Sequence, residues 1–312
     1  MKDTDVRSIS LATELCGLHL KNPLIAASGT FGFGREYDEL YDITCWGAIS
    51  VKGLTLEPRG GNPPRRIFEA SAGILNSVGL QNPGVRGFIR DELPWLKTRN
   101  LPVIANLAGS STKDYREGAA LLSDSSVDIV ELNISCPNIH SGGVHFGTSA
   151  KSVFAITDAV HTSCEKPLIV KLSPNVAEIS EVAKAAEEAG ADAVSLINTL
   201  TGMAIDARTR QPILANVTGG LSGPAIKPVA LRMVWQAAST VSIPVVGMGG
   251  IMTGEDVAEF MVAGAKAVMI GTANLVDPMA GPRILREFED FMRENDIAEA
   301  SELVNSLRTN EN

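Results

Sequence analysis

The chain has 312 residues, of which 45% are hydrophobic and 20% are charged, and it contains 29 glycines. This composition is typical of a globular α/β protein with enough apolar surface for a full core, and it argues against disorder. The net charge of -9 and the lack of a basic run argue against nucleic acid or an anionic membrane as the main partner.

Eight short apolar runs of strand length alternate with amphipathic segments along the chain. The runs cover residues 24–27, 47–51, 102–106, 128–133, 168–172, 192–197, 244–248 and 267–270. The segments between them carry helical spacing, and Ser149 and Thr253 are predicted helix N-caps. Because the runs are apolar on both faces, they predict parallel strands that are covered on both sides. Eight such units predict a closed (β/α)8 barrel, with a doubly wound open sheet as the alternative.

An internal half-repeat favours the barrel. Residues 189–194 read AGADAV and residues 263–268 read AGAKAV, so that a glycine ends each helix before the next strand. We expect residues 1–312 to form one barrel domain with a short N-terminal lead-in segment. Residues 135–148 and 199–223 form longer loops after the fourth and sixth strands. On a barrel rim, long structureless loops are usually lids or substrate clamps.

Four cysteines, at positions 16, 45, 136 and 164, show no metal-ligand spacing, so we expect no metal site and a reducing compartment. The chain begins without a secretory leader, and no apolar run approaches the roughly 18 residues that cross a bilayer. The sequence therefore predicts a cytoplasmic protein that is not attached to a membrane.

Glycine-rich segments stand at the ends of predicted strands. Residues 247–251 and 270–273 end the seventh and eighth strands, and residues 219–223 precede another helix. A single glycine often serves only a tight turn. Glycines also let backbone N–H groups approach a phosphate, and the rim near strands seven and eight is the usual phosphate site of such barrels. Together the three segments predict a phosphorylated ligand.

Lys52 and Lys171 sit at the ends of predicted buried strands, after residues 49–51 and 168–170. An unpaired buried ammonium is costly, so each side chain must reach the rim or an anion, unless it is a surface lysine that snorkels to water. Two such lysines would suit a flavin whose reduced form is anionic.

Asparagines are concentrated at or just beyond the predicted strand ends. Uncharged amides offer the donors and acceptors that hold a planar ring bearing carbonyl and N–H groups. Each asparagine alone is more often a turn or cap residue, but the clustering predicts a pyrimidine-like substrate. The asparagines concerned are Asn76, Asn82, Asn106, Asn133, Asn138 and Asn198.

Cys136 directly follows the fourth predicted strand, within the polar segment NISCPN at residues 133–138. Pro137 biases its backbone away from helix, which places the thiol on the rim. A free thiol there can accept a proton from a carbon acid. Cys16, Cys45 and Cys164 are interpreted as inert core residues.

These segments resemble the class 1 dihydroorotate dehydrogenases of pyrimidine biosynthesis over about residues 18–273. The matching motifs are AASG at 26–29, SVKG at 50–53, NSVGLQNPG at 76–84, NISCPN at 133–138, INT at 197–199 and GGLSG at 219–223. Cys136 matches the class 1 base, whereas class 2 enzymes carry a serine there and a membrane-associating N-terminal extension.

The resemblance implies that one flavin mononucleotide (FMN) is bound per chain. The implied FMN-binding residues are Ser28, Lys52, Gly53, Asn106, Asn133, Lys171, Ile197, Gly223, Gly249, Gly250, Gly271 and Thr272. The implied substrate-binding residues are Lys52, Asn76, Ser77, Val78, Gly79, Leu80, Asn133, Asn198 and Thr199. In this scheme Cys136 takes a proton from C5 of dihydroorotate while hydride leaves C6 for the flavin.

Residues 61–65 (GNPPR) and 81–84 (QNPG) look closer to subtype 1B than to the fumarate-using subtype 1A, which stays the alternative. Subtype 1B implies a homodimer of catalytic subunits within a heterotetramer, whose electron-transfer subunit carries FAD and a 2Fe–2S cluster and reduces NAD+. The cysteines of this chain form no cluster that would ligate iron and sulfur. More remote alternatives are a Schiff-base aldolase that uses Lys52 or Lys171, and a phosphate-binding barrel without catalysis.

Overall fold

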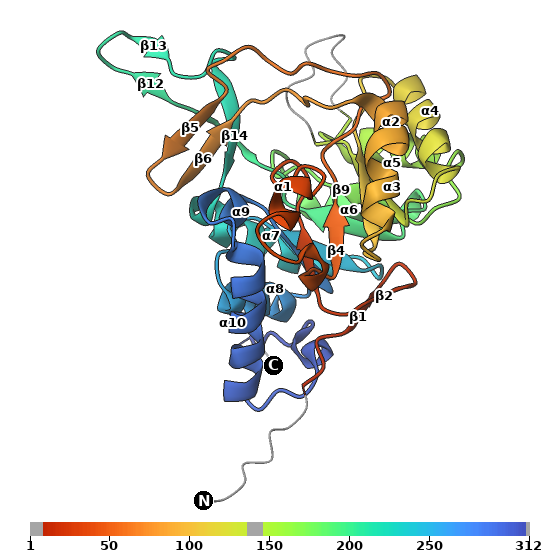
Figure 1. Cartoon of the computed structure of the whole chain (residues 1–312), viewed down its shortest axis with the longest axis vertical. Helices are drawn as coiled ribbons and strands as arrows, with labels where there is room; N and C mark the ends of the chain where they lie inside the picture. The colour runs from red at the N-terminus through yellow and green to blue at the C-terminus, as the bar shows by residue number, and fades with distance from the viewer. Residues whose placement is uncertain (1–8, 136–145, 310–312) are drawn as a thin grey trace, which may run out of the picture.

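The computed structural model describes residues 9–135 and 146–309, and a closed parallel barrel forms its centre. The strand order around the barrel is β10-β15-β16-β3-β4-β7-β8-β9 (Figure 1). All eight predicted strands and the predicted closure are confirmed, and the open sheet is excluded. The strands are β3 (Leu24–Ala26), β4 (Ala48–Ser50), β7 (Val103–Leu107), β8 (Ile129–Asn133), β9 (Leu168–Lys171), β10 (Ala193–Leu196), β15 (Val245–Met248) and β16 (Ala267–Ile270).

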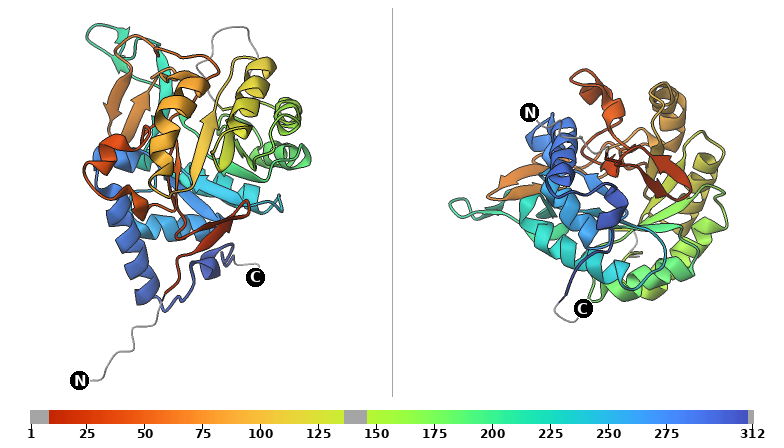
Figure 2. Two further views of the ribbon diagram at one scale, coloured as in Figure 1. Left: turned by 45° about the vertical axis from the view of Figure 1, so that its right-hand side comes forward. Right: turned by 90° about the horizontal axis from the view of Figure 1, so that it is seen from below.

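Helices surround the strands, as the view from below shows (Figure 2). Ser149 caps α5 by accepting a hydrogen bond from the Ser152 N–H, and Thr253 caps α8 in the same way from Asp256, so both predicted caps are confirmed. The longer helices are α4 (Thr112–Ser123), α5 (Ala150–His161), α6 (Ile179–Glu188), α7 (Lys227–Ala238), α8 (Gly254–Val262) and α10 (Ala280–Glu294). The shorter ones are α1 (Arg35–Asp38), α2 (Gly84–Gly87), α3 (Leu93–Lys97) and α9 (Thr272–Val276).

Successive residues of the barrel strands alternate between two separate apolar clusters. Ile104, Ile129 and Ile169 belong to the cluster inside the barrel, whereas their neighbours Val103, Val130 and Val170 pack into the layer under the helices. Leu15 and Leu20, from the hairpin of β1 (Thr13–Leu15) and β2 (Leu18–Leu20), join the interior cluster. The same alternation turns later residues of these strands, such as Asn106, Asn133 and Lys171, toward the barrel interior.

A second, four-stranded antiparallel sheet stands beyond the carboxyl ends of the barrel strands (Figure 1). Its order is β11 (Leu200–Met203), β14 (Thr218–Ser222), β6 (Gly73–Asn76) and β5 (Ile67–Ala70), and a hairpin of β12 (Ile205–Asp206) and β13 (Gln211–Pro212) extends from it. The prediction that residues 199–223 are structureless is therefore wrong. The reason is tertiary, because Gly220 of this segment pairs with Asn76 of a distant hairpin.

No helix among the described residues has both the length and the apolar character needed to span a membrane. The same residues contain no group of three or more histidine, cysteine, aspartate or glutamate side chains placed to hold a metal ion.

Candidate active site

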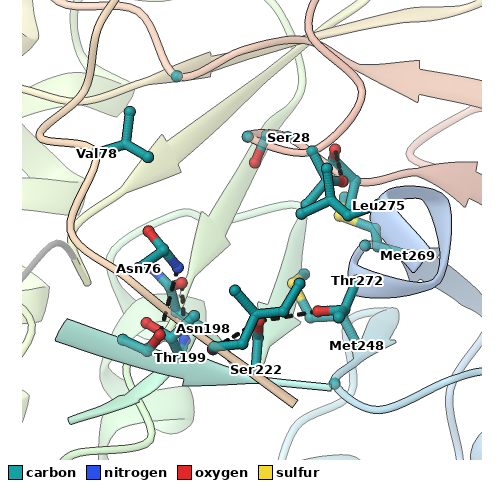
Figure 3. A pocket seen from close by; sticks show the side chains of 18 of the residues that line it. Ser28, Asn76, Val78, Asn198, Thr199, Ser222, Met248, Met269, Thr272 and Leu275 are labelled. Atoms are coloured by element: carbon teal, nitrogen blue, oxygen red, sulfur yellow. Dashed lines mark hydrogen bonds between the residues drawn. The ribbon is translucent and has the colours of Figure 1, made fainter. Parts of the chain in front are cut away.

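One pocket lies where the barrel strands end, and β5, β6 and β14 of the second sheet contribute to its wall (Figure 3). Asn76, Asn198 and Thr199 gather on one side of it, and Met248, Met269 and Leu275 lie on another. The pocket brings together nearly all the site residues named from the sequence. These are Ser28, Lys52, Gly53, Asn76, Val78, Gly79, Leu80, Asn106, Asn133, Lys171, Ile197, Asn198, Thr199, Gly223, Gly249, Gly250, Gly271 and Thr272.

Ser77 does not join them, although its neighbours Asn76 and Val78 line the pocket. Its side chain is buried, and among the described residues its Oγ finds no hydrogen-bond partner. Asn82 also has a structural role, because its side chain binds the backbone of Thr55, Leu80 and Gly84. Cys136 and Asn138 lie outside the described residues.

Lys171 ends β9 with its ammonium group at the pocket. The residue is only 5% exposed, and its hydrogen bond goes to a neutral partner, the Ser28 hydroxyl, at 3.3 Å. An ammonium group has three donors and is costly to bury without acceptors or an anion. The site therefore suits a ligand that brings an acceptor or a negative charge to Lys171.

Lys52 reaches the same pocket from the loop after β4 and lies 3.4 Å from the Gly29 carbonyl oxygen. Burial lowers the pKa of this ammonium group, and the positive charge of Arg66 lowers it further. A negatively charged ligand would reverse this trend, because it favours the charged form of the lysine.

A chain of hydrogen-bonded amides forms part of the pocket wall. The Asn133 Nδ2 donates to Asn106 Oδ1 at 3.1 Å, and Asn133 Oδ1 accepts from the Ser135 hydroxyl at 2.9 Å. Ser135 in turn accepts a hydrogen bond from Asn198 Nδ2 at 2.6 Å. The chain joins β7, β8 and the segment after β10, so three of the predicted asparagines act as one unit.

Glu131 lies below these amides and was not identified from the sequence. It is fully buried in β8, and it accepts hydrogen bonds from Ser50, Asn106 and Ser195. Its position two residues before Asn133 was an available signal, since residues two apart on a strand face the same side.

Much of the apolar part of the pocket wall was not predicted from the sequence. Ile67 and Ile74 come from the unpredicted β5–β6 hairpin, and Met248, Met269 and Leu275 line the pocket from the barrel side. Ser222, within the glycine-rich segment at 219–223, accepts a hydrogen bond from the Thr272 hydroxyl at 2.9 Å (Figure 3). Apolar side chains beside a few fixed polar groups are the usual surroundings of an organic ring.

Backbone conformation requires glycine at the end of β15. Gly249 and Gly250 have φ angles of 121° and 81°, which residues with a side chain rarely adopt. A Cβ at Gly250 would also lie 2.9 Å from the backbone nitrogen of Lys227. These two residues leave bare backbone facing the pocket, as a bound phosphate requires.

The three cysteines within the described part of the chain are free, and none of them lines the pocket. Burial raises the pKa of Cys16 to about 12 and that of Cys45 to about 11, and it also raises the pKa of Cys164. A raised pKa favours the protonated, unreactive thiol at neutral pH. Cys164 is buried as predicted for a core residue, whereas Cys16 and Cys45 are only partly buried.

Comparison with known proteins points to one family. The family model described as dihydroorotate dehydrogenase matches residues 10–292. A relative from Alkaliphilus oremlandii is 53% identical over 298 residues, which cover 96% of this chain and 99% of the relative. One from Geotalea uraniireducens is 53% identical over 300 residues, covering 96% and 98%, and one from Bacillus pumilus is 55% identical over 283 residues, covering 90% and 91%.

All three relatives carry the name dihydroorotate dehydrogenase B (NAD(+)), catalytic subunit. The match covers all eight barrel strands, both lysines and the amide chain of the pocket. The chain therefore belongs to the dihydroorotate dehydrogenase family.

Proposed function

We propose that this chain is the catalytic subunit of a class 1B dihydroorotate dehydrogenase, which oxidises dihydroorotate to orotate in pyrimidine biosynthesis and passes the electrons to NAD+ through a partner subunit. The observation that carries the proposal is the convergence of a buried lysine, Lys171, a half-buried lysine, Lys52, the amide chain and the glycine-rich segments on one pocket. Family membership and the names of the relatives support the reaction.

The residues present fit FMN as the cofactor. Lys171 lacks a charged partner in its hydrogen bond to Ser28, Gly249 and Gly250 expose backbone, and Met248 and Met269 offer an apolar surface for a ring. A bound FMN would supply the two-electron acceptor for the hydride that leaves C6 of dihydroorotate. We assign its binding to the twelve residues given above for the cofactor, from Ser28 to Thr272, all of which line the pocket.

The substrate is held by charge and by hydrogen bonds from this chain. Lys52 pairs with the carboxylate of dihydroorotate, while Asn76, Asn133, Asn198 and Thr199 bind the carbonyl and N–H groups of the ring. Val78, Gly79 and Leu80 contribute the neighbouring wall. Fixing the ring in one orientation lowers the entropic part of the barrier.

We assign the role of general base to Cys136, which accepts the proton from C5. It directly follows Ser135, whose hydroxyl is tied to Asn133 and Asn198 in the amide chain. The other three thiols have a raised pKa and do not line the pocket, which supports the assignment. General base catalysis contributes typically about 10²- to 10⁴-fold to a rate.

The name "catalytic subunit" implies a separate partner subunit. We propose that this partner carries FAD and a 2Fe–2S cluster and that two catalytic subunits form the core of a cytoplasmic heterotetramer. The expectation of a single domain over residues 1–312 stays a prediction.

The choice of electron acceptor tests the proposed function. We expect the chain purified with its electron-transfer partner to oxidise dihydroorotate with NAD+, and the chain purified alone to do so only with artificial acceptors. Stopped-flow or steady-state absorbance of NADH and orotate measures both. Rapid turnover of the isolated chain with fumarate would favour subtype 1A, and a colourless protein without flavin would contradict the assignment as a flavoenzyme.

The pH dependence of substrate binding tests the role of Lys52. Because burial and Arg66 lower the Lys52 pKa, the ammonium loses its proton at a lower pH than an ordinary lysine. The KM for anionic dihydroorotate should therefore rise as pH increases through this lowered pKa. Replacing Arg66 with glutamine removes one cause, so the rise should move to higher pH, whereas Arg90→Gln, at an exposed arginine, should not move it. Identical pH profiles for all three proteins would contradict the role of Lys52.

A further inference from the structure

Glu131 is a carboxylate inside the barrel, and among the described residues Asn106 is the one pocket-lining residue that donates a hydrogen bond to it. It is fully buried, as are its three partners Ser50, Asn106 and Ser195. The Oε2 atom accepts from Ser50 at 3.0 Å and from Asn106 at 2.5 Å, and Oε1 accepts from Ser195 at 2.7 Å. These three partners, which are the ones found in residues 9–135 and 146–309, are neutral donors, and burying a carboxylate without a counter-charge is costly. Apolar residues fill the neighbouring interior positions Ile129, Ile104 and Ile169, so packing alone does not require an acid here.

The hydrogen bond from Asn106 links Glu131 to the pocket. Asn106 gives its Nδ2 to Glu131, which leaves its Oδ1 to accept from Asn133 Nδ2. Asn133 then presents its Oδ1 to the Ser135 hydroxyl, and Ser135 accepts from Asn198. All the hydrogen bonds of this chain therefore run in the same direction, with each donor on the side of the pocket and each acceptor on the side of Glu131. Asn106, Asn133 and Asn198 all line the pocket.

The chemistry of the carboxylate explains this order. An asparagine amide turned by 180° keeps almost the same shape but exchanges its donor and its acceptor. The Oε2 atom accepts from both Ser50 and Asn106, so a turned Asn106 would place its carbonyl oxygen against an acceptor. Asn106 is thus held in one orientation. Through the chain of hydrogen bonds, that orientation determines which donors and acceptors of Asn133, Ser135 and Asn198 remain free to bind a ligand.

We propose that Glu131 is a positioning residue that fixes the donor and acceptor orientation of the pocket amides and so selects a ring with the matching pattern of carbonyl and N–H groups. The identity of that ring as orotate rests on the proposed function. The orientation of the amides does not, because it follows from hydrogen bonds within this chain.

Two substitutions separate the acceptor from the charge. In Glu131→Gln the new amide oxygen can take the place of Oε2, while its NH2 group faces Ser195, whose hydroxyl can accept. In this arrangement Asn106 keeps an acceptor for its Nδ2 and Ser195 keeps a hydrogen-bond partner, so the orientation of Asn106 seen here loses no hydrogen bond. Glu131→Met has a similar length but offers no acceptor, so both orientations of Asn106 become accessible. Thr157→Val serves as a control for a buried polar side chain, since Thr157 lies on α5 outside the barrel interior and its Oγ1 has no partner among the described residues.

The first measurement needs no orotate. In holoprotein labelled with 15N-asparagine, the side-chain NH2 signals of Asn106 and Asn133 should each form one pair in the wild type, in Glu131→Gln and in Thr157→Val. In Glu131→Met they should double or broaden. A single unshifted pair in Glu131→Met would overturn the proposal.

The second measurement is the dissociation constant of orotate, followed through the flavin absorbance so that only folded, flavin-containing protein is counted. We expect Glu131→Met to weaken orotate binding by about tenfold, as for a buried polar group left without its partner, and Glu131→Gln to restore most of it. A purely structural role would lower the melting temperature and leave this constant unchanged, which would overturn the proposal. An equal loss of orotate affinity in Glu131→Met and Glu131→Gln would also overturn it, because the affinity would then depend on the charge of Glu131 and not on its acceptor atoms. If the wild type did not bind orotate, the proposed function would fail, and the amide spectra would still decide the role of Glu131.

Discussion

Replacing Cys136 with serine is expected to lower dihydroorotate turnover near neutral pH by about 10²- to 10⁴-fold, the usual contribution of a general base. An ordinary cysteine thiol has a pKa of about 8.5, so a fraction of it is ionised near neutral pH, whereas a serine hydroxyl stays protonated. The residual turnover should therefore rise steeply as the pH is increased. FMN content, measured from the ratio of flavin to protein absorbance, should stay at the wild-type level.

Cys45→Ser is the matched control for this substitution. Cys45 is a free, half-buried thiol in the short 3-10 helix at Ile43–Cys45, and it does not line the pocket. It should keep wild-type turnover. Unchanged turnover in Cys136→Ser, with flavin bound, would remove Cys136 from the role of base.

Replacing Lys171 with methionine should weaken FMN binding and make the bound flavin harder to reduce. The substitution removes a buried ammonium group from the pocket, where the proposed FMN would become anionic on reduction. A hydrogen bond to a charged group contributes about 1.5–3 kcal/mol. For a two-electron couple this corresponds to a midpoint potential roughly 30–60 mV lower. Dye-coupled reduction measures the potential, and fluorescence of released FMN measures the affinity.

Lys113→Met controls for the loss of a positive charge as such, because the side chain of Lys113 is 79% exposed on α4. Its potential and FMN affinity should match the wild type, since charges on the surface are screened by water and salt. An unchanged potential in Lys171→Met would show that this lysine does not stabilise the reduced flavin, although it lines the pocket.

The barrel strands and several pocket residues could be predicted from local sequence. The apolar runs define the strands because each strand is buried on both sides, and Ser149 and Thr253 mark helix starts through their own side chains. Lys52 and Lys171 could be predicted as site residues because a charged side chain at the end of a buried strand must reach the rim or an anion. Ser77 shows the limit of this reasoning, since a motif match does not say which neighbour turns toward the ligand.

Sequence by itself thus determined the alternation of strand and helix, because this follows from periodicities within short segments. It predicted a closed barrel with its pocket where the strands end, and the structure excluded the open sheet. Only the tertiary structure decided the second sheet and the surroundings of Glu131. Asn76 and Gly220 are 144 positions apart, and the partners of Glu131 come from three other strands. Such contacts depend on how distant segments pack against each other, and no local pattern of residues encodes the choice of partner.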